Sequence, residues 1–332
     1  MRLPSLKLPR KRPGLLFTLV GPAGAGKNRL MAYILEHTRL RQLPTATTRA
    51  IRPGEQEGRE HLFVSRAHFE QMIEADELLE HQVIHGNLYG IPRAAVESAL
   101  DSGEALIADI EVYGAARARE AYPDNVVSIF IQPPSIGTLI QRMRDRGERE
   151  GEIGKRLLRV PLEIEYAEAC HYVILNDSLD HAEDLLYRIV AAELDDSAER
   201  VSGDTLIVYH FRYLTQVILT YGDEVLRNTT APADLTAPFS RHDLPHTVAL
   251  RLVETAFGFA APESSLRGGD KPDGSYLPPA LLEYTTDDAI EQVIYVYLYA
   301  LDKRIPAPGG WAWQPIETLP EPMRSLRAEQ TP

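Results

Sequence analysis

A glycine-rich segment near the start of the chain, residues 21–27 (GPAGAGK), has the spacing of a phosphate-binding loop. The backbone N–H groups of such a loop converge on one point, and the positive end of a following helix strengthens their attraction for an anion. Lys27 would add a positive charge at the β and γ phosphates of a nucleotide. The motif normally continues with Ser or Thr, which ligates Mg²⁺, but this chain has Asn28.

A second group of residues has the chemistry of another anion site. Arg49 and Arg52 lie three positions apart and are followed directly by a Pro-Gly turn. Guanidinium groups match phosphate oxygens bidentately, so two arginines beside a tight turn form a compact anion clamp. Glu80 and residues 86–90 (GNLYG) follow in the same stretch of chain. Together with the glycine loop, these residues favour a phosphate-binding function over two solvated surface arginines.

The elements that would position these residues can be recognised from apolar runs. Four runs have the length and composition of strands buried on both faces, namely residues 15–20, 105–110, 126–131 and 172–175. The first run leads into the glycine loop, after which apolar residues recur at helical spacing, namely Leu30, Met31, Ile34 and Leu35. Helical segments lie between the strands. This alternation predicts an α/β fold with a mostly parallel sheet.

At this point the chain resembles guanylate kinases, P-loop enzymes that phosphorylate GMP with ATP. The resemblance covers residues 14–195 and rests mainly on residues 47–58 (TTRAIRPGEQEG) and on the GNLYG segment. It implies a P-loop kinase with a small acceptor-binding subdomain at about residues 44–93 and a mobile lid at about residues 138–158.

The resemblance also implies the site residues. ATP would be bound by Gly21, Pro22, Ala23, Gly24, Ala25, Gly26, Lys27, Asn28 and Asn176. GMP would be bound by Thr45, Arg49, Arg52, His61, Glu80, Tyr89 and Glu111. Catalysis would use Lys27 with the lid arginines Arg142, Arg146 and Arg156. Asn28 and Asp109 would hold Mg²⁺.

Within the acceptor site, the implied roles divide between phosphate and base. Arg49, Arg52 and Tyr89 would hold the GMP phosphate, whereas Thr45, Glu80 and Glu111 would contact guanine. A carboxylate suits guanine because its N1–H and 2-amino group are both donors, a pair that adenine does not present on that edge.

Several positions depart from the family pattern and leave the acceptor open. His61 occupies the position of a tyrosine in the family pattern. Ile91 replaces a serine, Glu111 replaces an aspartate, and Thr45 replaces a serine. The implied reaction is ATP + GMP to ADP + GDP, with dGMP as a weaker acceptor. The alternatives are a related kinase acting on another phosphorylated acceptor, such as ribose 1,5-bisphosphate, and a non-catalytic module that binds phosphopeptides. Lys27 and the three lid arginines favour an enzyme.

Composition limits the other function classes. The chain has 332 residues, 44% of them hydrophobic, and a formal net charge of −13. These values are typical of a globular protein and argue against one that coats nucleic acid. The single cysteine, Cys170, excludes an internal disulfide and favours a reducing, cytoplasmic location. No apolar run approaches the ~18–20 residues of a membrane span, so we expect no membrane contact. Residues 1–13, rich in Lys, Arg and Pro, are interpreted as a basic flexible tail.

The second half of the chain has a different character. A polar linker at residues 196–204 precedes residues 205–332, for which the apolar spacing predicts a mainly α-helical domain. One helix would carry Ile207, Phe211, Leu214 and Ile218. A second would follow Pro245 and end at Gly258, and a third, capped at residues 285–288, would continue to Leu301. No catalytic motif is recognisable, so we expect this domain to mediate regulation or self-association.

Overall fold

A computed structural model of the chain describes residues 13–52, 54–59, 61–84, 86–195, 201–207, 209, 211–230, 235–240, 243–267, 277, 279–287 and 290–319. The chain divides into two compact units. Unit 1 consists of Met1–Pro134 and Leu162–Ile207, and unit 2 of Ser135–Pro161 and Val208–Pro332. The chain therefore enters each unit twice. The predicted basic tail, apart from Pro13, lies outside the described residues.

Unit 1 is built on a five-stranded sheet in the order β2-β7-β1-β8-β9, in which every pairing is parallel. The strands are β1 (Leu15–Val20), β2 (Arg41–Gln42), β7 (Ala105–Asp109), β8 (Val126–Gln132) and β9 (Tyr172–Leu175). All residues of β1 and β8 are buried, which explains why these strands read as unbroken apolar runs. The predicted α/β fold with a parallel sheet is confirmed.

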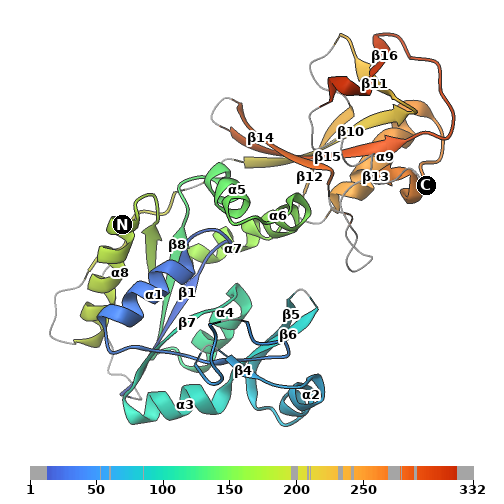
Figure 1. Cartoon of the computed structure of the whole chain (residues 1–332). Coiled ribbons are helices and arrows are strands. Elements are labelled where there is room, and N and C mark those ends of the chain that lie inside the picture. The colour runs from blue at the N-terminus through green and yellow to red at the C-terminus, as the bar shows by residue number, and fades with distance from the viewer. Residues whose placement is uncertain are drawn as a thin grey trace. The chain divides into compact units, whose positions relative to one another are not determined.

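Helices connect the strands and supply the core (Figure 1). They are α1 (Lys27–His37), α3 (Arg93–Ser102), α4 (Val112–Ala121), α7 (Val160–Ala167) and α8 (Leu179–Leu194). One core cluster joins strand residues such as Leu16 and Phe130 to Leu100 of α3 and Ala115 of α4. Since α1 begins directly after β1 and its loop, the fold fixes the glycine segment at the end of a buried strand.

A smaller four-stranded sheet of unit 1 has the order β4-β3-β6-β5. Its strands are β3 (Thr45–Thr47), β4 (His61–Phe63), β5 (Leu78–Ile84) and β6 (Asn87–Pro92). Helix α2 (Arg66–Glu74) covers the sheet by packing Phe69 and Met72 against Ala46, Leu78 and Leu88. This sheet coincides with the region expected to bind the acceptor.

Unit 2 begins with two helices and continues with another sheet and the helix that packs on it. The helices, α5 (Ile136–Asp145) and α6 (Glu150–Leu157), are called the lid helices below because they span the predicted lid. The seven-stranded sheet consists of β10 (Phe211–Tyr221), β11 (Glu224–Asn228), β12 (Leu235–Phe239), β13 (Leu266–Arg267), β14 (Leu281–Asp287), β15 (Ile290–Ala300) and β16 (Trp311–Pro315). The long strands β10 and β15 pair in parallel, and helix α9 (Pro245–Phe257) contacts β10, β12 and β15. This sheet and α9 are called the C-terminal domain.

The prediction of a mainly helical second half was wrong. Residues 211–221, expected to continue a helix, form β10, in which Tyr213, Thr215, Val217 and Leu219 are buried in strand alternation. The expected third helix is the hairpin of β14 and β15. Strand β15 is buried on both faces for most of its length, and such a continuous apolar run cannot be told from a buried helix by its spacing alone. Only the expected helix between Pro245 and Gly258 is present as α9.

The predicted linker lies within unit 1, which extends to Ile207. Residues 196–200 lie outside the described residues, while residues 201–207 are hydrogen-bonded to β8 and β9. The Asp204 N–H donates to Val173 O at 2.8 Å, and the Gln132 side chain bonds both backbone groups of Ile207. Throughout the described ranges, the helices are too short or too polar to span a bilayer.

Candidate active site

The glycine loop depends on backbone conformations that side chains disfavour. Gly21, Gly24 and Gly26 have φ values of 140°, 87° and 102°. A Cβ on Gly21 would lie 2.4 Å from Ile131 O, and a Cβ on Gly26 would lie 2.2 Å from Asn176 Nδ2. Only glycine combines a positive φ with the absence of a Cβ, and Gly21 and Gly26 need both. The loop therefore has the form expected of a phosphate-binding loop at a helix N-terminus.

The Asn176 side chain is hydrogen-bonded to the backbone of this loop. It directly follows β9, is 4% exposed, and its side-chain amide donates to Ala25 O at 2.7 Å. Its own N–H donates to Gln132 O, also at 2.7 Å. Asn176, which the resemblance implies as an ATP-binding residue, is thus engaged with the loop backbone. Its place directly after the apolar run of residues 172–175 indicates the end of a buried strand, but this signal does not reveal the contact with the loop.

Lys27 and Asp109 meet beside the loop. Lys27 Nζ donates to Gly21 O at 2.6 Å and to Pro22 O at 3.3 Å, and it lies 3.7 Å from Asp109 Oδ1. Burial raises the pKa of Asp109, Lys27 opposes this effect, and Glu111 adds to it through like-charge repulsion. A cation placed near Asp109 would therefore stabilise its ionised form.

The donors available for Mg²⁺ are oxygen atoms, as this hard cation requires. Asp109 offers a half-buried carboxylate at the end of β7, and Asn28 offers an exposed amide as the second residue of α1. The described ranges hold no cluster of three or more His, Cys, Asp or Glu side chains arranged for a metal ion. These donors fit the usual mode of Mg²⁺ binding, in which one or two protein ligands act together with substrate phosphates.

The predicted arginine clamp is organised by Glu55. Arg49 donates to both carboxylate oxygens of Glu55, at 3.0 and 2.8 Å, and its Nε donates to the Tyr89 hydroxyl at 3.2 Å. The Arg52 N–H also donates to Glu55, at 2.8 Å, while the Arg52 side chain is exposed. The hydrogen bonds from Arg49 lower the pKa of Glu55 to about 2. Sequence reasoning included Glu55 in the motif but gave it no role.

His61 and Thr45 complete this part of the small sheet. Thr45 Oγ1 and His61 Nδ1 are 2.8 Å apart, on the parallel strands β3 and β4. The His61 ring makes edge contacts with Phe63 and Tyr89, whose centroids lie 5.5 and 6.0 Å away. The Arg49 guanidinium lies 5.6 Å from the Phe63 ring centroid, within cation–π range. Five side chains thus form one connected polar and aromatic group.

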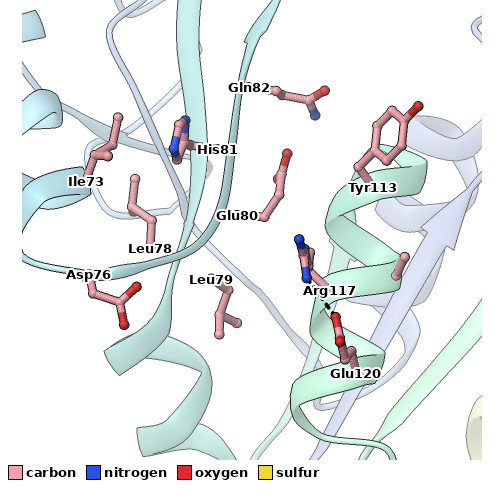
Figure 2. A pocket seen from close by; sticks show the side chains of 11 residues that line it. Ile73, Asp76, Leu78, Leu79, Glu80, His81, Gln82, Tyr113, Arg117 and Glu120 are labelled. Carbon is pink, nitrogen blue, oxygen red and sulfur yellow. Dashed lines mark hydrogen bonds and ion pairs between the residues drawn. The ribbon is translucent and has the colours of Figure 1, made fainter.

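Glu80 lies on β5 and lines an open pocket of about 810 Å³ between β5 and α4. Figure 2 shows Glu80 facing α4, from which Tyr113 and Arg117 approach the same pocket. Burial raises the pKa of Glu80 to about 7, and the nearby charge of Glu111 contributes to this shift. Gly114 of α4 makes room for the Glu80 carboxylate, since a Cβ there would lie 3.1 Å from Glu80 Oε2. The two carboxylates expected to contact a base are therefore close enough to interact.

The three predicted lid arginines all lie on the lid helices or next to them, in unit 2. Arg146 donates to Glu148 Oε1 at 2.6 Å, and Arg156 Nε lies 3.0 Å from Glu148 Oε2. Glu148, which sequence reasoning did not single out, therefore lies between two of the arginines. Arg142 is half-buried, and this burial lowers its pKa.

A family model described as guanylate kinase matches residues 14–193, more than half of the chain. The chain belongs to the guanylate kinase family. It is 41% identical over 185 residues to the guanylate kinase of Bradyrhizobium diazoefficiens, and the aligned region spans 55% of this chain and 84% of that protein. It is 44% identical over 187 residues to the guanylate kinase of Desulfitobacterium hafniense, and here the aligned region spans 54% of this chain and 90% of that protein.

Among solved structures, the guanylate kinase from Anaplasma phagocytophilum is 32% identical and covers 57% of this chain and 90% of that chain, with a TM-score of 0.45. The guanylate kinase family match thus covers nearly all of unit 1 and the lid helices, while the C-terminal domain lies beyond it. As a family member, the chain is a nucleoside monophosphate kinase.

Proposed function

We propose that this guanylate kinase family member transfers the γ-phosphoryl group of ATP to GMP, giving ADP and GDP, and that dGMP is a weaker acceptor. The observation that carries the proposal is the position of Glu80, which lines the pocket, with Glu111 near enough to contribute to its raised pKa. Two carboxylates match the N1–H and 2-amino donors of guanine, whereas the adenine edge would leave an acceptor without its donor.

The phosphate of GMP would be held by Arg49 and Tyr89. Arg49 is already oriented by Glu55 and by the Tyr89 hydroxyl, so binding requires little reorganisation of its side chain. The Arg52 side chain is exposed, and it would contact the phosphate from the segment between β3 and β4. His61 would contribute a ring N–H in place of the tyrosine of the family pattern, with Thr45 fixing the orientation of the ring.

At the ATP side, the loop N–H groups and Lys27 would bind the β and γ phosphates. Asp109 and Asn28 would hold Mg²⁺, which would offset the negative charge of the phosphate groups. A GMP phosphate oxygen would form a bond to the γ phosphorus of ATP. The bond between the γ phosphorus and the β–γ bridging oxygen would break, and ADP would leave with that oxygen. No strong general base is required because the attacking phosphate is already anionic. Arg142, Arg146 and Arg156 would stabilise the charge on the transferring group.

A coupled ADP-release assay with ATP and a panel of nucleoside monophosphates tests this proposal. We expect turnover with GMP, weaker turnover with dGMP, and little with AMP, CMP or UMP. Glu80→Gln should reduce discrimination between bases, whereas Arg49→Ala should raise the acceptor KM whichever base is present. Glu74→Gln, an exposed carboxylate at the end of α2, is the matched control and should leave both properties unchanged.

The same assay separates the alternatives. Turnover with ribose 1,5-bisphosphate in place of GMP would assign the chain to the other kinase reaction. Absence of turnover with every acceptor, together with binding of a phosphopeptide, would exclude the kinase proposal altogether.

A further inference from the structure

We infer that the C-terminal domain is a positioning domain for the lid: it holds the lid helices through specific hydrogen bonds, so that the lid arginines move together with it. The lid helices belong to the same compact unit as the C-terminal sheet. The catalytic consequence of this inference rests on the proposed function, but the attachment itself does not.

The first attachment joins both lid helices to one backbone position of β14. Arg144 of α5 and Glu150 of α6 form a bidentate ion pair, with N–O distances of 2.7 and 2.9 Å. Arg144 also donates to Leu282 O at 2.8 Å, and the Leu282 N–H donates to Glu150 Oε2 at 3.2 Å. The ion pair therefore satisfies a backbone donor and acceptor that β14 does not use in pairing with β15.

The second attachment is at the N-terminus of α5. Glu291 of β15 accepts a hydrogen bond from the Ile136 N–H, with N–O distances of 3.2 and 3.3 Å to its two oxygens. Tyr284 of β14 donates to Glu291 Oε1 at 2.5 Å, which fixes the carboxylate. A negative charge is favourable at a helix N-terminus. The Tyr284 ring also lies against Gly137, where a Cβ would approach the ring to 2.6 Å.

The third attachment is at the end of α6 and is buried. The Tyr295 hydroxyl donates to Gly154 O at 2.8 Å, and the Tyr213 hydroxyl donates to Leu157 O. Both tyrosines are nearly inaccessible, with exposed fractions of 0% and 5%. A buried hydroxyl that loses its acceptor is costly, so separation of α6 from the sheet would be opposed at both residues.

These attachments alternate with the lid arginines along the chain. Arg142 lies on α5 two residues before Arg144, and side chains two residues apart on a helix differ in direction by about 200°. Because Arg144 contacts β14, this geometry directs Arg142 away from that strand. Arg146 follows directly after α5, two residues beyond Arg144. Arg156 lies between the anchored carbonyls of Gly154 and Leu157. The C-terminal domain thus sets the orientation of each arginine through a residue one or two positions away.

Hydrogen exchange combined with steady-state kinetics on the full chain tests the inference. The test variant is Tyr284→Phe/Glu291→Ala, which removes the second attachment and alters no residue assigned to the active site. The matched control is Glu224→Ala, which breaks the exposed ion pair with Arg304 elsewhere in the same sheet. We expect exchange of the amides in residues 136–157 and of Leu282 to rise about tenfold in the test variant and to stay unchanged in the control.

With ATP and GMP, kcat of the test variant should fall about tenfold, while the KM for GMP should change less than about twofold, because Arg49 and Glu80 lie in unit 1. A second variant, Gly137→Ala, places a methyl group against Tyr284 without removing a hydrogen-bonding group. It should show the same pattern, and adding Tyr284→Ala should reverse part of its effect on exchange.

Unchanged exchange at residues 136–157 and Leu282 in both variants would overturn the inference. So would increased exchange with kcat unaltered, since the arginines would then act independently of the attachment. A wild-type chain without GMP-dependent turnover would instead refute the proposed function, and the exchange measurement would still decide whether the domain holds the lid.

Discussion

The Arg49 guanidinium and the Glu55 carboxylate face each other in a bidentate pair, with N–O distances of 3.0 and 2.8 Å. Their side chains are only 11% and 19% exposed, so solvent screens this pair less than a surface ion pair. Glu55 also accepts the Arg52 N–H, which ties the two arginines of the clamp to one carboxylate. The phosphate of the acceptor would thus meet an arginine that is already ordered.

Glu55→Gln should destabilise the protein in a pH-dependent manner. The pKa of Glu55 is lowered from 4.5 to about 2, so its stabilising contribution is complete above pH 4.5 and is lost as the pH falls towards 2. We expect a loss of about 1–3 kcal/mol in the free energy of unfolding at pH 7. Urea denaturation at several pH values measures this difference, which should shrink below pH 4.5. A constant difference down to pH 3 would contradict the assignment.

The affinity for GMP should depend on the ionisation of Glu80. Its pKa is about 7 in the free protein, and only the carboxylate accepts both guanine donors. Between pH 8 and pH 6, kcat/KM for GMP should therefore fall about tenfold, reflecting the free-enzyme ionisation. Glu80→Gln should abolish this dependence, whereas Arg49→Ala should retain it at a lower overall value. The same profile in both variants would assign the titration to another group.

Glu80 should also reduce stability at neutral pH. Because its pKa is raised from 4.5 to about 7, the unfolded chain releases this proton at lower pH than the folded chain. Stability should consequently fall as the pH rises from 4.5 to 7, and Glu80→Gln should recover about 1–3 kcal/mol at pH 8 but little at pH 4.5. Thermal unfolding at the two pH values distinguishes this from a uniform effect of the substitution.

Gly26→Ala should prevent ATP binding while leaving GMP binding intact. The added methyl group would lie 2.2 Å from Asn176 Nδ2 in a backbone with φ of 102°. We expect the Kd for a non-hydrolysable ATP analogue to rise about 100-fold, as seen by calorimetry. Gly222→Ala, where φ is 53° and nothing lies within 4 Å, is the control for backbone strain alone. Retained ATP affinity in Gly26→Ala would mean that the loop adopts another conformation when it binds phosphate.

Asn28→Ser should lower the Mg²⁺ concentration that gives half-maximal activity. The Asn28 amide oxygen is a donor of the right type, but the side chain is longer than that of the usual serine, so Mg²⁺ should be bound less well in the wild type. The order of preference among acceptors should not change, because Asn28 belongs to the ATP side. Titration of Mg²⁺ at fixed ATP and GMP measures the effect. Equal Mg²⁺ dependence, or full activity of the wild type in EDTA, would refute this role.

The sequence predicted unit 1 well because its signals are local. Residues 15–20 are an apolar run that ends in a glycine motif, and both the strand and the loop follow from that pattern. In contrast, the apolar spacing of β10 and β15 predicts helices, because their pairing joins residues about 80 positions apart and does not affect the local spacing. Long-range pairing of this kind is visible only in the folded chain.

The residues of the candidate site also fall into those that local sequence predicts and those that depend on long-range contacts. The residues expected to touch phosphate could be found because motifs place them at fixed spacing. Glu55, Glu148 and Asn176 act on other protein groups, and such contacts depend on how separate elements meet. The attachments of the lid helices to Tyr284 and Glu291 could not be predicted from the sequence either, because they join residues more than 140 positions apart.

The division of unit 2 into two separate segments of the chain has a consequence for biosynthesis. The ribosome completes α5 and α6 before it has made any strand of the C-terminal sheet, since that sheet begins at Phe211. A nascent chain that has reached residue 195 already contains the glycine loop, the acceptor sheet and Asn176. Its lid helices then lack the partners Leu282, Tyr284 and Glu291. With the lid held as inferred above, full activity would appear only after Leu282, Tyr284 and Glu291 have been synthesised and folded, and chains truncated before them would bind nucleotides without turning them over efficiently.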